Sequence, residues 1–243
     1  MALILALDSS TDACSVALYA HGELHATFEL AAKSHTQRLL PMVDELLRAQ
    51  GISLRDLDTI AFGRGPGSFT GLRICMGIVQ GLAFGANLPV IPVSTLEAMA
   101  LGFYRTNSAS PACTQPVIVA LDARMNEVYC CAYKHAGDGV QALADEVVIK
   151  PELLAADSDL PVSPQAFIGV GPGWHYPAMQ SLAPQSVELD VHPRAEEMAL
   201  IAARLWAEGK AIDVLDAEPV YLRDSVSWQK RQRIRAADEL LVK

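Results

Sequence analysis

The sequence predicts an α/β protein made of two duplicated lobes, each with its elements in the order βββαβα. Two repeated patterns support this fold class. A strand ending in Ala-Leu-Asp at 6–8 recurs at 120–122, each followed at the same spacing by a tyrosine. A glycine-rich string at 63–67 recurs in similar form at 169–173. Because both matches occur in the same order, they favour an internal duplication over chance recurrence.

The chain of 243 residues is 51% hydrophobic and 19% charged, so it has enough apolar surface for a core and is long enough for two lobes. The first lobe is expected at 1–105 and the second at 116–243. The segment 106–115, rich in Ser, Thr, Asn and Pro, is expected to connect them. An amphipathic helix at 195–208 ends before Gly209, and we expect it to pack back on the first lobe.

Charge and cysteine content argue against several function classes. The net charge is -9, and such a field repels phosphate backbones, so a large nucleic-acid surface is not expected. The five cysteines are odd in number and form no CxxC motif, which argues against a disulfide framework or a thiolate metal site. The first residues lack the basic segment of a signal peptide. We therefore expect a cytoplasmic protein.

Hydrophobic periodicity gives the elements of the first lobe. Three strands come first, with a tight turn between the last two, and they are expected at 3–8, 14–20 and 24–30. A helix follows, with Ser34 or Thr36 as its N-cap and Gly51 at its end. The next elements are a strand, a glycine-rich loop, a helix and a short strand, at 59–62, 63–71, 72–85 and 89–93.

The second predicted helix carries an unusual glycine pattern. The segment 74–91 is almost uncharged, but polar residues and a proline interrupt it, so we expect a buried helix and not a membrane span. Gly77, Gly81 and Gly85 recur every four residues and share one helix face. Each costs about 0.5–1 kcal/mol relative to alanine, so a close contact must compensate. That contact is either the protein's own sheet, slightly favoured for the glycines alone, or a partner helix.

Asp8-Ser9-Ser10 ends the first predicted strand. Hydroxyl and N–H groups there can converge on an anion, and Asp8 can hold a hydrated magnesium ion. An equally weighted alternative is that Asp8 caps the hairpin while Ser9 and Ser10 satisfy backbone groups.

The glycine-rich loop leads directly into a helix. The N–H groups of Gly65, Gly67 and Ser68 would then meet the positive end of the helix dipole, which suits a phosphate or carboxylate. The alternative is a rigid turn with Ser68 or Thr70 as the N-cap. The loop is neither a Walker loop nor a nucleophile elbow, because the required Lys and Gly are missing.

No catalytic or metal-binding set is predicted. His21 and His25 lie across a predicted hairpin, where their spacing does not indicate a metal site, and His35 at a helix start is better explained as a neutral hydrogen-bonding residue than as a base. The segment 228–235 is the one basic cluster in an acidic chain. It can contact RNA or an acidic partner, but a solvated end is the favoured interpretation.

Two duplicated lobes with a hairpin after an Asp-ending strand resemble the actin and sugar-kinase architecture, in which phosphates lie between the lobes. The resemblance makes a remnant nucleotide site for ATP or ADP a candidate here. Its residues would be Asp8, Ser9, Ser10, Gly65, Gly67 and Ser68. No other cofactor is expected.

Nearly the whole chain resembles the TsaB family, bacterial subunits needed to make threonylcarbamoyladenosine in tRNA, also described as inactive glycoprotease homologues. The stretches that carry the resemblance are 4–11, Ser34-His35 with Leu39-Leu40-Pro41, 65–73, 122–124 with 127–129, and 219–223. Together they are highly specific, whereas the aspartate strand and glycine loop alone would be weak.

The resemblance implies a non-catalytic, actin-like subunit that pairs with a larger catalytic paralogue, TsaD-like, joined by a small TsaE-like ATPase. That enzyme would form threonylcarbamoyladenosine at position 37 of tRNAs reading codons that start with adenine. The paralogue holds an iron- or zinc-type metal on two histidines, whose positions are taken here by Thr95 and Met99. Neither replaces an imidazole, so this chain is not expected to bind that metal. Contact with tRNA would be indirect or through the basic C-terminal tail.

The resemblance also implies a partner interface on two helices of the first lobe, within 35–50 and 72–85, as a heterodimer with the paralogue and as a homodimer when alone. The residues assigned to it are His35, Leu39, Val43, Leu72, Met76, Gly77, Gly81 and Gly85. The resemblance therefore favours the interpretation that the three glycines form part of a partner face.

Two other functions remain open at this point. An actin-like small-molecule kinase would use Asp8 and the two glycine loops with magnesium-ATP. An active peptidase would need a nucleophile or metal set, which the sequence does not supply.

Overall fold

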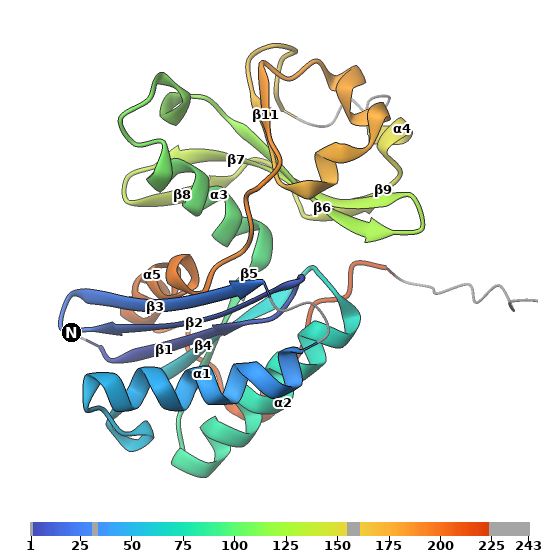
Figure 1. Ribbon diagram of the computed structural model, residues 1–243. Coiled ribbons are helices and arrows are strands. Elements are labelled where there is room, and N and C mark those ends of the chain that lie inside the picture. Colours follow the sequence, from blue (N-terminus) through green and yellow to red (C-terminus); the bar gives the residue numbers. More distant parts are fainter. Residues whose placement is uncertain (1, 31–33, 155–160, 224–243) are drawn as a thin grey trace, which may run out of the picture.

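The computed structural model describes residues 2–30, 34–154 and 161–223, and it has two lobes, each built on one sheet (Figure 1). The first sheet has the order β3-β2-β1-β4-β5. Its strands are β1 (Ile4–Asp8), β2 (Ala13–Ala20), β3 (Glu23–Leu30), β4 (Thr59–Gly65) and β5 (Val90–Ser94). The first three strands are antiparallel neighbours, whereas β4 and β5 run parallel to β1.

The second sheet repeats this topology, with the order β11-β10-β6-β7-β8 and β9 paired to β7. Its strands are β6 (Val117–Arg124), β7 (Glu127–Ala136), β8 (Gly139–Ala142), β9 (Val147–Ile149), β10 (Ile168–Val170) and β11 (Ser186–Glu188). The pairs β8–β7 and β7–β6 are antiparallel, and the pairs β6–β10 and β10–β11 are parallel, as in the first sheet. Equal strand order and direction confirm the predicted fold class of two duplicated α/β lobes.

Helices cover both faces of the first sheet. Helices α1 (His35–Gln50) and α2 (Phe69–Ala86) pack on one face, beneath the sheet in Figure 1, and contribute to one hydrophobic cluster with β1, β2 and β4. Helix α5 (Ala195–Ala207) packs on the other face. Short helices cover the second sheet, namely α4 (Pro151–Leu154) and the 3-10 segments η3 (Pro172–His175) and η4 (Pro177–Leu182).

Helix α3 (Thr95–Thr106) lies between the lobes and was not among the elements expected from the sequence. Ser94 caps it by accepting a hydrogen bond from the N–H of Glu97 at 3.2 Å. The helix is buried on several sides, so its apolar residues show no simple amphipathic stripe. The expected connector 106–115 follows it and contains the 3-10 segment η2 (Pro111–Thr114).

Among the described residues, one helix, α2, is long and apolar enough to cross a membrane, judged by length and composition alone. One of its faces packs in the core of the first lobe through Cys75, Met76 and Val79. A core helix of a water-soluble protein passes the same test, but only 33% of α2 is buried. The expectation of a helix buried on most sides is therefore corrected, because the face of α2 opposite the core is exposed.

Candidate functional site

Asp8 ends β1 in a fully buried position. Its Oδ2 accepts hydrogen bonds from the N–H and the hydroxyl of Ser10, at 3.2 and 3.0 Å, while its Oδ1 has no hydrogen-bond partner among the described residues. Burial raises the pKa of Asp8 to about 7, although the Ser10 bonds oppose the shift. Near neutral pH this carboxyl therefore exists in both protonation states.

The glycine-rich loop packs directly on this turn. The N–H of Ser68 donates to the carbonyl of Ser10 at 2.6 Å, and the hydroxyl of Ser9 donates to the carbonyl of Gly71 at 3.0 Å. A Cβ at Gly67 or Gly71 would overlap the backbone of that turn, which explains why both positions are glycine. Ser68 also caps α2 by accepting from the N–H of Gly71 at 3.3 Å.

The structure thus brings together five of the six residues of the candidate nucleotide site, namely Asp8, Ser9, Ser10, Gly67 and Ser68. The sixth, Gly65, lies instead beside Leu72 and the carbonyl of Val220. Asp8, Ser9 and Ser10 are at most 1% exposed, and both serine hydroxyls are used within the protein. This geometry favours the second interpretation of the turn, in which the polar groups satisfy one another and fasten the loop to β1.

The residues assigned to a partner interface fall into two groups. Five of them are buried and face the interior of the first lobe, namely His35, Leu39, Val43, Leu72 and Met76. Their assignment to a surface is therefore corrected, because an amphipathic helix turns this face to its own sheet. They hold α1 and α2 in place from inside.

The three glycines of α2 lie on the opposite face. Gly77, Gly81 and Gly85 are exposed, and a Cβ at any of them would meet no atom of the described residues within 4 Å. The alternative that they pack on the protein's own sheet is therefore wrong. Beside them, the side chains of Phe69 and Phe84 are 59% and 73% exposed. We call the surface formed by Phe69, Ile74, Gly77, Gly81, Phe84 and Gly85 the glycine face.

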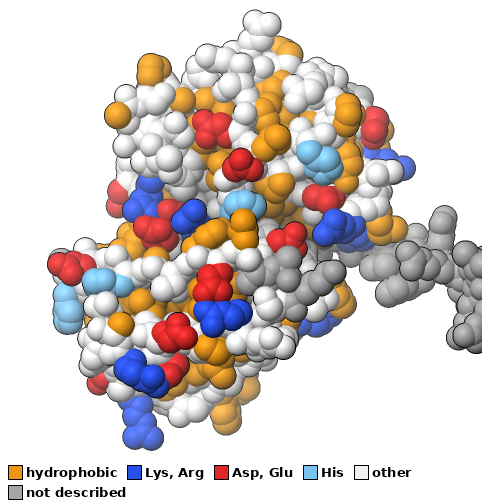
Figure 2. Space-filling view, in the orientation of Figure 1, with side chains coloured by type: hydrophobic (Ala, Val, Ile, Leu, Met, Phe, Trp, Pro, Cys, Tyr) orange, Lys and Arg blue, Asp and Glu red, His pale blue; other side chains and the backbone are white. Residues whose placement is uncertain are grey.

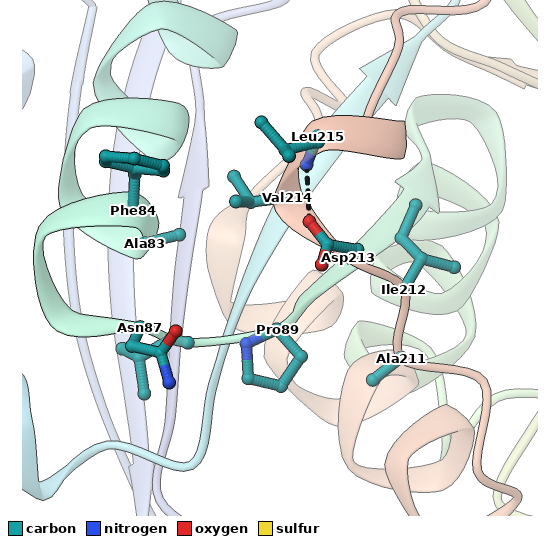
Figure 3. A pocket seen from close by; sticks show the side chains of 10 residues that line it. Ala83, Phe84, Asn87, Pro89, Ala211, Ile212, Asp213, Val214 and Leu215 are labelled. Carbon is teal, nitrogen blue, oxygen red and sulfur yellow. Dashed lines mark hydrogen bonds between the residues drawn. The ribbon is translucent and has the colours of Figure 1, made fainter.

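A groove of about 540 Å3 continues from the C-terminal end of α2 (Figure 3). Phe84 borders it on the helix side, and Ile212 and Leu215 on the other side. Leu215 is 77% exposed. The sequence analysis did not single out this groove, because residues far apart in the chain form it.

The two positions that the family resemblance matches to metal-binding histidines lie in the first two turns of α3. Thr95 and Met99 are fully buried, and the methyl group of Met99 lies against Gly171 of the second glycine loop. The hydroxyl of Thr95 has no hydrogen-bond partner within the described part of the chain. The same part holds no group of three or more His, Cys, Asp or Glu residues placed to bind a metal ion.

In the second lobe, Asp122 occupies the position that corresponds to Asp8 in the sequence repeat. Its Oδ1 accepts from the N–H of Arg124 at 2.8 Å and from the hydroxyl of Tyr176 at 2.9 Å. Asp122 is partly exposed, unlike Asp8. The predicted basic tail at 228–235 lies outside the described residues.

Comparison with known proteins supports one family. Residues 25–168 match a family model described as "TsaD: tRNA N6-adenosine threonylcarbamoyltransferase". The "tRNA threonylcarbamoyladenosine biosynthesis protein TsaB" of Escherichia coli (strain K12) is 46% identical over 233 residues, which cover 93% of this chain and 97% of the relative. The protein of the same name from Haemophilus influenzae is 40% identical over 234 residues, covering 93% and 96%.

A solved structure, YeaZ from Pseudomonas aeruginosa, superposes with a TM-score of 0.83 at 40% identity. The match covers 91% of this chain and 100% of YeaZ. Both lobes are therefore shared with this relative.

Proposed function

The chain belongs to the TsaB family of tRNA threonylcarbamoyladenosine biosynthesis proteins, and from this premise we propose that it is a non-catalytic subunit that binds and activates a larger TsaD-like transferase. The reaction would form threonylcarbamoyladenosine at position 37 of tRNAs that read codons starting with adenine. The chain would act in the cytoplasm, and a small TsaE-like ATPase would join the complex.

The observation that carries the partner proposal is the exposed glycine face of α2. Three helix-interior glycines each cost stability, and within the described part of the chain nothing lies close enough to compensate. A helix laid against them can approach closely, and Phe69 and Phe84 would bury apolar surface at its sides. Such a face is rarely left exposed in a working complex.

Relatedness to the transferase model indicates which helix the partner would offer. Because this chain matches that model over 25–168, which includes α2, the partner is expected to carry a helix equivalent to α2. Two related chains can pair through equivalent surfaces about a pseudo-twofold axis, as identical chains do about a true one. The same face would then join two copies of this chain when the transferase is absent.

Burial and internal hydrogen bonding at the candidate nucleotide site support the proposed non-catalytic role. Asp8 is enclosed, and its neighbouring hydroxyls are engaged within the protein. A kinase needs a carboxylate that reaches metal-bound ATP, so the enclosed position of Asp8 argues against the kinase alternative. We propose that no nucleotide is required between these lobes, and that tRNA is contacted by the partner or by the basic tail.

The direct test uses the transferase from the same organism. Gly81→Arg places a charged side chain in the middle of the glycine face, where the isolated chain has room for it. We expect this variant to fold normally, to lose binding in calorimetry and to fail to support threonylcarbamoyladenosine formation. The matched control is Gln141→Arg on exposed β8, which should bind as the unchanged chain does. Unchanged binding by Gly81→Arg would overturn the proposed face.

A further inference from the structure

Helix α3 is one of the two places where the chain crosses between the lobes. Its Ala98 and Leu101 pack in a cluster with α5 and β5 of the first lobe, and Phe103 packs with β6 and β7 of the second. Ion pairs fasten α3 to α5, with Arg105 bonded to Glu197 at 2.6 Å and Arg204 bonded to Glu97 at 3.0 Å. The chain crosses between the lobes a second time at 189–194, from β11 to α5. A lobe joined through one helix and one extended segment can still rock about the helix, so contacts away from these crossings decide how firmly the second lobe is held.

The segment 211–223, which we call the strap, follows α5 and first runs along the first lobe. Ile212 exchanges two backbone hydrogen bonds of 2.9 Å with Val90 of β5. Val214 and Ala217 are buried in the same cluster as α2, and the side-chain amide of Gln80 donates to the carbonyl of Ala217 at 3.5 Å. The strap is therefore anchored along the length of α2.

Its last residues reach the other lobe. The N–H of Val220 donates to the carbonyl of Arg64 at the end of β4, at 2.8 Å. Three residues later, the guanidinium of Arg223 donates to the carbonyl of Ala123 at 3.1 Å and pairs with Glu127, both at the β6–β7 turn. In Figure 1 this red segment leaves the first lobe on the side of the molecule away from α3.

A second tie between the lobes uses the side chain of Arg64. Its guanidinium lies 3.1 Å from a carboxylate oxygen of Glu146, which follows β8 in the second lobe. The other oxygen of Glu146 accepts from the hydroxyl of Ser94, at the end of β5. The side chain of Arg64 is 26% exposed and that of Glu146 is 13% exposed. Solvent therefore screens their attraction less than it screens a fully exposed ion pair. Arg64 thus serves both ties, through its carbonyl and its guanidinium.

We propose that the strap and the Arg64–Glu146 pair act together as a clamp that fixes the angle of the second lobe about α3. Arg223 and Glu127 close one side of the clamp, and Arg64, Glu146 and Ser94 close the other. Charge-assisted hydrogen bonds of this kind have defined directions, so they hold an angle and not merely a distance. The inference concerns the chain alone and does not depend on the proposed partner.

The test compares hydrogen exchange in the full chain for Arg223→Gln, Glu146→Gln and the double variant. We expect the N–H of Val220 to exchange about three- to tenfold faster in Arg223→Gln, because its neighbouring anchor is lost. The double variant should in addition show a larger radius of gyration in solution scattering. The matched control is Arg48→Gln, which removes an exposed pair with Asp44 within α1 and should change neither measurement.

Protection of α3 amides reports whether the lobes remain folded in each variant. If the double variant unfolds, Glu127→Gln alone provides the same test of the strap with a smaller change. The clamp is refuted if Val220 exchanges at its original rate in both Arg223→Gln and Glu127→Gln. It is equally refuted if the folded double variant scatters as the unchanged protein does.

Discussion

Gly63 and Asp8 lie beside each other where the parallel strands β4 and β1 end. A Cβ at Gly63 would overlap Oδ1 of Asp8 and approach the methyl group of Met198 to 3.1 Å. This contact explains the glycine at 63 without any strained backbone angle, since its φ is not in the left-handed region. The repeated glycine string therefore has a packing role at its first position.

We predict that Gly63→Ala lowers the free energy of unfolding by about 1–3 kcal/mol, because the added methyl group overpacks a closed site. The control is Gly81→Ala, where the methyl group meets none of the described residues within 4 Å. This control should raise the free energy of unfolding by about 0.5–1 kcal/mol. Chemical denaturation measures both. A Gly63→Ala variant as stable as the unchanged chain would show that Asp8 can move away from β4.

Asp8 should also make stability depend on pH. Its pKa is about 7 in the folded chain because of burial, against about 3.9 for an unfolded aspartate. Between these values the folded state binds more protons than the unfolded state, so stability falls as pH rises from about 4 to 7. Asp8→Asn cannot ionise and escapes this loss.

We therefore predict that Asp8→Asn gains stability relative to the unchanged chain by about 2–3 kcal/mol between pH 5 and pH 8. Urea denaturation at the two pH values measures the difference. Asp12→Asn, at an exposed position of the same turn, is the control and should show no such change. An equal difference at both pH values would mean that Asp8 ionises as freely in the folded chain as in the unfolded one.

At the scale of elements, helix α2 combines two faces with opposite requirements. One face carries the branched and sulfur-containing side chains that pack on the first sheet, and the other carries the three glycines. Periodicity placed the helix and its glycines correctly. The family resemblance assigned the partner interface to the helix without separating its outward face from its inward one, which is why Leu72 and Met76 were assigned to a partner although they are buried.

This division leads to a prediction about stability and binding. Replacing Gly77, Gly81 and Gly85 together by alanine should raise the free energy of unfolding of the isolated chain by about 1.5–3 kcal/mol. The same methyl groups should weaken binding to the transferase at least about tenfold, because they hold the partner helix away. Denaturation and calorimetry measure the two effects.

Gly102→Ala is the matched control for the triple variant. Gly102 lies inside α3, and a Cβ there would make ordinary contacts of 3.5 Å with Glu197. The Gly102→Ala variant should leave partner binding unchanged. If the triple variant binds as tightly as the unchanged chain, the glycines do not serve a close helix approach.

At the scale of the whole molecule, the sequence repeat predicted the duplicated topology but not what joins the lobes. The two sheets share one strand order, as an internal duplication predicts. The ties between the lobes bring together Arg64 with Glu146, and Arg223 with Glu127, across large separations in the chain. No periodicity or spacing signals such pairs. In the space-filling view, charged side chains of both signs gather where the lobes meet (Figure 2).

Helix α2 and the strap touch at the N-terminal end of the helix, which links the proposed partner face to the clamp. The rings of Phe69 and Tyr221 are 5.7 Å apart, and the guanidinium of Arg73 lies over Phe69 at 3.2 Å from the ring centre. Both rings are about half exposed, at 59% and 46%. A partner seated on the glycine face would bury Phe69 and restrict Tyr221 through it.

We therefore predict that binding of the transferase slows hydrogen exchange of strap residues 217–223, measured in the complex against the free chain. In Arg223→Gln, the second lobe is no longer tied to the strap, so protection should still reach Tyr221 while the β6–β7 turn beyond it gains none. Because the variant leaves the glycine face intact, its affinity should change by less than about tenfold. Equal protection of that turn in both chains would show that the partner reaches the second lobe directly and not through the strap.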